Sequence, residues 1–177
     1  MVNNNEEMRN IISAYEIVRN KINYENRLLE NADFRLKQNP NDQTWQIIKT
    51  EHTERLKGAE SELAMLEQQL QEFKKICVFN EWQELLTNVG YVIAKTERIG
   101  HVCDNLYDEF DLKKAIDNTS NRILAIQEEL VVANEQKDED TKILLEAQLQ
   151  YYKEDMKQHF WGEQRLTEIL KADTPSR

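Results

Sequence analysis

Glycine and proline are scarce in this sequence, which has four glycines and two prolines among 177 residues. Ordinary proteins carry about 7% glycine and about 5% proline. Few sharp turns can be built from so few turn-forming residues, so the secondary-structure elements must be long. Charged residues make up 32% of the chain, and strong helix formers such as Glu, Leu, Gln and Lys recur throughout. The sequence therefore predicts an all-α protein.

Cysteines and long apolar runs are also lacking. Cys77 and Cys103 stand far apart, with no CxxC pair, which fits a reducing compartment. No apolar run approaches the roughly 18 residues of a membrane-spanning helix. The first residues, MVNNNEEMRN, do not show the basic and then apolar order of a signal peptide. We expect a soluble protein of the cytoplasm.

Negative charge is in excess and unevenly spread. The chain has a net charge of −10; residues 1–79 hold 13 acids and 11 bases, and residues 80–177 hold 20 acids and 12 bases, which gives −2 and −8. Free nucleic acid is therefore not an expected ligand, because phosphates need a basic surface. We expect a protein partner with a basic surface.

The first 79 residues predict a long antiparallel helical hairpin. From about Asn5 to Gln38, a seven-residue apolar period contains Met8, Tyr15, Ile22, Leu29 and Leu36, with Ile11, Val18 and Ala32 three residues further on and Glu25 as the one exception. Pro40 ends this helix and Asp42 is a good N-cap for the next. The second helix, about Gln43 to Val78, repeats a narrow stripe through Trp45, His52, Ala59, Leu66 and Phe73. Such narrow stripes leave apolar residues that could recruit another copy, so a homodimer is plausible.

Residues 80–177 predict a compact acidic helical bundle that forms one cooperative unit with the hairpin. Asn80 is expected to cap a third helix, with Gln83 in the capping-box position. Its wide apolar face marks it as the central helix. A break is expected at DEFDLKK (108–114) or at DNTSN (117–121), and the last helix should end near Lys171.

The stretch NEQKDEDTK, residues 134–142, contains no glycine or proline, so a continuous helix is possible there. However, it offers nothing apolar to bury over nine residues. It also places aspartate and threonine just before an apolar run, as the first connection does. We therefore favour a second hairpin that turns near Gln136 to Asp140, with Asp138 or Asp140 capping the last helix.

Two carboxylate pairs are spaced for a magnesium site: Glu81 with Glu84, and Asp108 with Asp111. This spacing resembles the EXXE and EXXD signature of the all-α nucleotide pyrophosphohydrolases of the MazG type, with Asp at position 108 where that family has Glu. The resemblance implies Mg²⁺-dependent hydrolysis of nucleotides. The pairs can meet only if the helix breaks at Gly90 or Gly100, since one continuous helix would hold them about 40 Å apart.

Other chemistry finds no support in the residues. The chain has no G-x-S-x-G, no glycine-rich phosphate loop and no Glu-x-x-His pair. His159 and Glu163 are four residues apart, but one such pair cannot complete a metal site. We expect a protein that is not an enzyme and has no catalytic residues, no metal and no cofactor.

Two features indicate a partner-binding surface. The second turn concentrates acidic charge, and two aromatic residues of the last helix fall beside its main stripe, as interface anchors often do. The predicted binding residues are Glu128, Glu129, Glu135, Asp138, Glu139, Asp140, Tyr151 and Trp161. We interpret the chain as a non-catalytic inhibitor or adaptor that docks on a basic, possibly nucleic-acid-binding, protein, as viral counter-defence decoys do. The alternative is a coiled-coil scaffold or assembly subunit, and the pyrophosphohydrolase is the third hypothesis.

Overall fold

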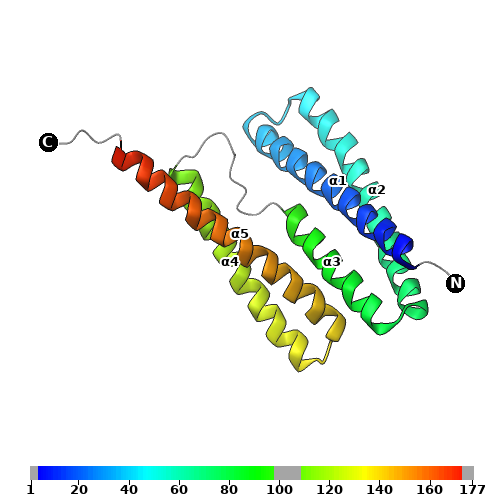
Figure 1. Ribbon diagram of the computed structural model, residues 1–177. Coiled ribbons are helices and arrows are strands. Elements are labelled where there is room, and N and C mark those ends of the chain that lie inside the picture. The colour runs from blue at the N-terminus through cyan, green and yellow to red at the C-terminus, as the bar shows by residue number, and fades with distance from the viewer. Residues whose placement is uncertain (1–3, 98–108, 173–177) are drawn as a thin grey trace. The chain divides into compact units, whose positions relative to one another are not determined.

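The computed structural model describes residues 4–97 and 109–172, apart from the side chains of residues 109–111 and 170. Its helices are α1 (Asn4–Gln38), α2 (Gln43–Ile76), α3 (Phe79–Glu97), α4 (Glu109–Glu135) and α5 (Glu139–Ala172) (Figure 1). The predicted all-α class is confirmed. The helices form two compact units, α1 to α3 and α4 with α5. Within the described ranges, no helix has both the length and the apolar character needed to cross a membrane.

The α1–α2 hairpin forms where the sequence predicts it. Asp42 is the N-cap of α2, and its Oδ1 accepts a hydrogen bond of 3.3 Å from the backbone N–H of Trp45. Part of the predicted stripe is buried on both helices, through Met8, Ile11, Tyr15, Val18 and Ala32 of α1 and Ala59, Leu66, Leu70 and Phe73 of α2, whereas Ile22, Leu29, Leu36 and Trp45 are half-buried. Because both stripes follow the same seven-residue period, they pack along the whole contact.

The two polar residues in these stripes meet each other. Glu25 interrupts the apolar period of α1, and His52 interrupts that of α2. Their side chains are only 9% and 12% exposed and form a hydrogen-bonded pair between the helices. Each side chain is therefore the hydrogen-bond partner of the other, at a place where burial of an unpaired polar group would destabilise the fold.

Helix α3 packs on α1 and runs parallel to it. Asn4 donates a hydrogen bond to Glu81 at the start of α3, and Arg19 donates one to Thr96 near its end, each over 3.3 Å. An ion pair of 2.9 Å between Lys95 and Glu16 lies between them. The contacts therefore group α3 with the N-terminal hairpin, whereas the sequence predicts a boundary between residues 79 and 80 and places this helix at the centre of the C-terminal bundle.

The N-terminus of α3 lies slightly earlier than predicted. The backbone N–H of Val78 donates to Oε1 of Glu81 over 3.1 Å, so Glu81 takes the reciprocal place of a capping box that begins at Val78. The prediction of Asn80 as the cap with Gln83 three residues later is therefore wrong. Glu81 lies two residues before Gln83, the residue that this prediction requires, and its carboxylate accepts the hydrogen bond of the Val78 N–H.

The second unit is an antiparallel hairpin of α4 and α5. Its described core includes Leu112, Ile126 and Ala133 from α4 with Leu145 and Tyr152 from α5. Residues 117–121 are helical, so no break occurs at DNTSN. Thr119 at its centre is fully buried, and burial of this face holds the stretch in a helix despite its weak helix formers. Helix α4 begins at Glu109, inside the other predicted break.

Candidate partner-binding surface at the tip of the second hairpin

The turn between α4 and α5 is built from a complete set of backbone hydrogen bonds. Lys137 has a φ of 56° and is the one described non-glycine residue with a positive φ. Its N–H donates to the carbonyl of Asn134 over 3.2 Å, and the N–H of Asp138 donates to that of Ala133 over 3.0 Å. This pair of bonds is the Schellman motif, which ends a helix with a left-handed residue. The chain therefore reverses within three residues.

Asp138 ends this turn and begins α5. Its Oδ1 accepts a hydrogen bond of 3.1 Å from the Thr141 N–H, and its Oδ2 accepts one of 2.6 Å from the Thr141 hydroxyl. The backbone carbonyl of Asp138 accepts from Lys142 over 3.0 Å. Asp138 is thus the N-cap of α5. The predicted turn at 136–140 with an aspartate cap is confirmed.

The acidic residues of this segment lie on and just behind the turn, which we call the acidic tip. It comprises Glu128, Glu129, Glu135, Asp138, Glu139 and Asp140; all are exposed except Asp140, which is half-buried. Residues 128–140 contain these six acids and one base, Lys137, for a net charge of −5. Glu129 lies 3.6 Å from Arg122, whose side chain is half-buried.

Apolar side chains share one face of α4 with two of these acids, a feature that the charge pattern alone does not reveal. Leu124 and Val131 are 58% and 57% exposed. Together with Glu128 and Glu135 they follow the spacing of one helical face, at intervals of four, three and four residues. The spacing of these four residues is visible in the sequence and could have identified the shared face. The face therefore combines negative charge with apolar area.

The two predicted aromatic anchors lie apart from the acidic tip. Tyr151 is half-buried and makes an edge-to-face contact with Tyr152, with ring centroids 5.7 Å apart. Trp161 is 58% exposed, and the guanidinium of Arg165 lies 5.6 Å from its ring centroid. At about 1.5 Å per residue, Trp161 lies about 30 Å along α5 from Asp140. The structure therefore does not bring Trp161 and the tip into one contact area.

The carboxylate pairs proposed for magnesium are only partly described. Glu81 accepts hydrogen bonds from Asn4 and from the Val78 backbone, and Glu84 is exposed on α3. Asp108 and the side chain of Asp111 lie outside the described residues. Nε2 of His159 lies 3.2 Å from Asp155 rather than beside Glu163. Over the described parts of the chain, no group of three or more His, Cys, Asp or Glu side chains could hold a metal ion.

Comparison of the chain with protein-family models, with characterised proteins and with solved structures gives no match. Its function is therefore inferred from the charge, exposure and geometry of its own residues.

Proposed function

We propose that the chain is a non-catalytic binding protein, an inhibitor or adaptor that docks its acidic tip on a basic surface of a protein partner. The observation that carries this proposal is the placement of six acids and one base around a single tight turn at the end of a helical hairpin. A basic surface that normally binds phosphates is a natural target for such a cluster, because exposed carboxylates present the same charge.

The rigidity of the turn supports this role. Lys137 adopts a left-handed conformation that costs a non-glycine residue about 1 kcal/mol, and the capping bonds of Asp138 hold the first turn of α5 in place. The backbone of Glu135 and Glu139 is therefore held at the ends of two helices and does not belong to a flexible loop. A preorganised surface loses less conformational entropy when it binds.

The composition of the α4 face supports a protein as the target. Leu124 and Val131 are exposed beside the acids of this face, with Val131 between Glu128 and Glu135. Apolar area contributes to affinity at protein interfaces, whereas complementary charge mainly contributes specificity and a fast association rate. We place the main contact on α4 and the turn, with Tyr151 at its periphery and Trp161 outside it.

The proposal is tested by affinity capture from the native host lysate with the full chain as bait. Three exposed acids are neutralised together, as Glu128→Gln, Glu135→Gln and Glu139→Gln. Asp138 is left intact because it caps α5. We expect a basic protein to be captured by the native chain, to be released as salt rises, and to be lost with the triple variant.

A matched control removes the same charge from the other unit, as Glu30→Gln, Glu51→Gln and Glu60→Gln, which are exposed positions of α1 and α2. This control should capture the partner as the native chain does. Equal loss in both variants would show that only net charge matters. Capture of a salt-resistant assembly that survives in both variants would instead favour the coiled-coil scaffold.

A further inference from the structure

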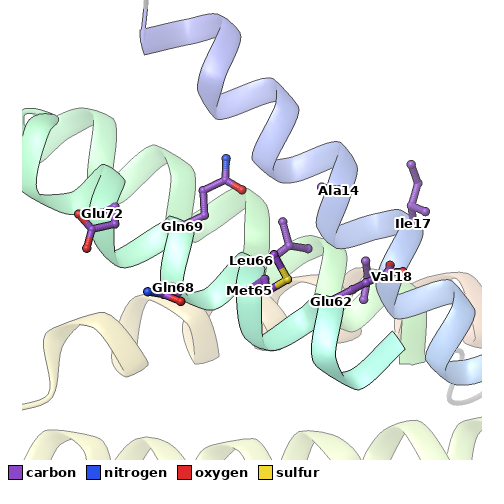
Figure 2. Close-up of a pocket in the computed structure, with 9 residues that line it drawn as sticks. All are labelled: Ala14, Ile17, Val18, Glu62, Met65, Leu66, Gln68, Gln69 and Glu72. Atoms are coloured by element: carbon purple, nitrogen blue, oxygen red, sulfur yellow. The ribbon is translucent and has the colours of Figure 1, made fainter. Parts of the chain in front are cut away.

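One side of the α1–α2 hairpin carries an open apolar groove that nothing in its own unit fills. The groove has a volume of about 610 Å³, and Ala14, Ile17 and Val18 of α1 and Met65 and Leu66 of α2 form its apolar part (Figure 2). Val18 and Leu66 belong to the buried stripe, whereas Ile17 is 56% and Met65 70% exposed. Ile17 and Met65 are thus large, solvent-exposed apolar side chains beside a groove that buried apolar residues also line.

A glycine extends this groove along the hairpin. Gly58 lies in the middle of α2 and seven residues before Met65, so the two share one side of the helix. A Cβ placed on Gly58 would meet nothing within 4 Å. Glycine in an exposed helix interior costs about 1 kcal/mol relative to alanine, and no contact within the chain requires it. A glycine at such a place permits close approach of another helix.

The residues along this side are matched in pairs across the hairpin. Lys21 of α1 contacts Glu62 of α2 over 3.3 Å, which fixes the level at which the two helices face each other. Ile17 lies four residues before Lys21 on α1, and Met65 lies three residues after Glu62 on α2. Tyr24, which is 59% exposed, lies three residues after Lys21, and Gly58 lies four residues before Glu62. At each level, a residue of α1 is therefore matched by one of α2: apolar Ile17 by apolar Met65, basic Lys21 by acidic Glu62, and large Tyr24 by small Gly58.

From this pattern we propose that the groove binds the same groove of a second copy of the chain, about a two-fold axis that runs parallel to the hairpin. This operation places α1 of one protomer on α2 of its partner at the same level. Ile17 then packs on Met65 of the other protomer, and Tyr24 enters the space above its Gly58. Lys21 comes level with the opposite Glu62, so two bases and two acids alternate around the axis.

The resulting assembly is a four-helix bundle in which every neighbouring pair of helices is antiparallel, the common arrangement of such bundles. A two-fold interface requires a self-complementary patch, and the alternation of Lys21 with Glu62 and of Tyr24 with Gly58 has this property. A helix of an unrelated protein would carry the matching order of charged, large and small residues only by chance. The surface is separate from the acidic tip and does not depend on the function proposed for it.

The test is the mass of the full chain in solution, measured by sedimentation equilibrium over a wide range of concentration. We expect a species of twice 21.1 kDa. Met65→Lys should weaken the dimer at least about 100-fold, because it buries a charge at the centre of the interface. Ile169→Lys is the matched control, since Ile169 is 49% exposed but belongs to the other unit, and it should leave the dimer intact.

Gly58→Leu separates assembly from folding. Leucine is a better helix former than glycine and meets open space within the chain, so the variant should be helical and at least as stable as a monomer. It should nevertheless abolish the dimer, because its side chain occupies the space of the opposing Tyr24. A native chain that is monomeric at all concentrations would overturn the proposal. So would a dimer that survives both Met65→Lys and Gly58→Leu.

Discussion

Nδ1 of His52 lies 2.5 Å from Oε2 of Glu25 across the α1–α2 hairpin. The two residues come from different helices and each is the polar member of an otherwise apolar stripe. Only one alignment of the helices lets them meet, and any shift would leave two polar groups buried without partners. The pair therefore defines the register of the hairpin, as single buried polar residues do in coiled coils.

The first prediction concerns this pair. Glu25→Leu or His52→Leu alone should lower the free energy of unfolding by about 2–3 kcal/mol, because the remaining partner stays buried without its hydrogen bond. The double variant should regain most of this loss, since two leucines complete the apolar stripe. Urea unfolding of the four proteins measures the coupling. Additive losses would show that the two side chains act independently.

The second prediction concerns the left-handed residue of the tight turn. Lys137→Gly should raise the free energy of unfolding by about 0.5–1 kcal/mol, because glycine adopts a φ of 56° without strain. Lys137→Val should lower it by about 1 kcal/mol or more, because a β-branched side chain is strained there. Thermal unfolding followed by circular dichroism separates the two. Equal effects of glycine and valine would contradict the observed turn.

A third prediction separates the two roles of Asp138. Asp138→Asn keeps an oxygen that can accept from Thr141, so the stability of the protein should change little, whereas Asp138→Ala should cost about 1 kcal/mol. Asparagine removes one negative charge of the tip, so partner binding should weaken in both variants. Unfolding and binding are measured on the same three proteins. Full binding by Asp138→Asn would restrict this residue to its capping role.

The fourth prediction is a loss of stability at high pH that depends on Tyr15. Burial, together with the negative charge of Glu67, raises the pKa of Tyr15 from 10.0 to about 12, against a smaller opposing effect of Arg19. Between these values the unfolded chain has already released this proton and the folded protein has not. The unfolded state therefore binds fewer protons, and the free energy of unfolding falls as pH rises.

Tyr15→Phe should remove this part of the pH dependence. Urea midpoints of the native chain and the variant, compared at about pH 9 and about pH 11, give the difference in slope. Tyr91→Phe is the control, because Tyr91 is half-buried on α3 and has no part in the proposed dimer groove. An unchanged slope in Tyr15→Phe would contradict the assignment.

The sequence predicted those features that depend on neighbours along the chain. The seven-residue period and Asp42 define the first hairpin, and the Asp138-x-x-Thr141 order marks the second. The position of α3 depends instead on contacts between residues far apart in the chain, such as Arg19 and Thr96, which are 77 residues apart. Such contacts leave no local period, so the grouping of α3 with α1 could not be predicted from it.

The same limit applies to the surfaces. The acidic residues of the tip and their net negative charge can be identified from the sequence. The shared face of Leu124 and Val131 with the acids is visible in the sequence as a helical spacing, but the exposure of these two residues depends on which face of α4 packs on α5. The level match of Tyr24 with Gly58 depends on contacts between the two helices of the hairpin, such as that between Lys21 and Glu62.

The most direct test of the central claim is the salt dependence of binding between the purified chain and the basic partner that it captures. The dissociation constant is measured over a series of salt concentrations for the native chain, the Glu128→Gln, Glu135→Gln and Glu139→Gln triple variant, and the Glu30→Gln, Glu51→Gln and Glu60→Gln control. We predict that the tip variant binds at least about tenfold more weakly at low salt and shows a shallower salt dependence, while the control matches the native chain. Identical curves for the native chain and the tip variant would contradict the account.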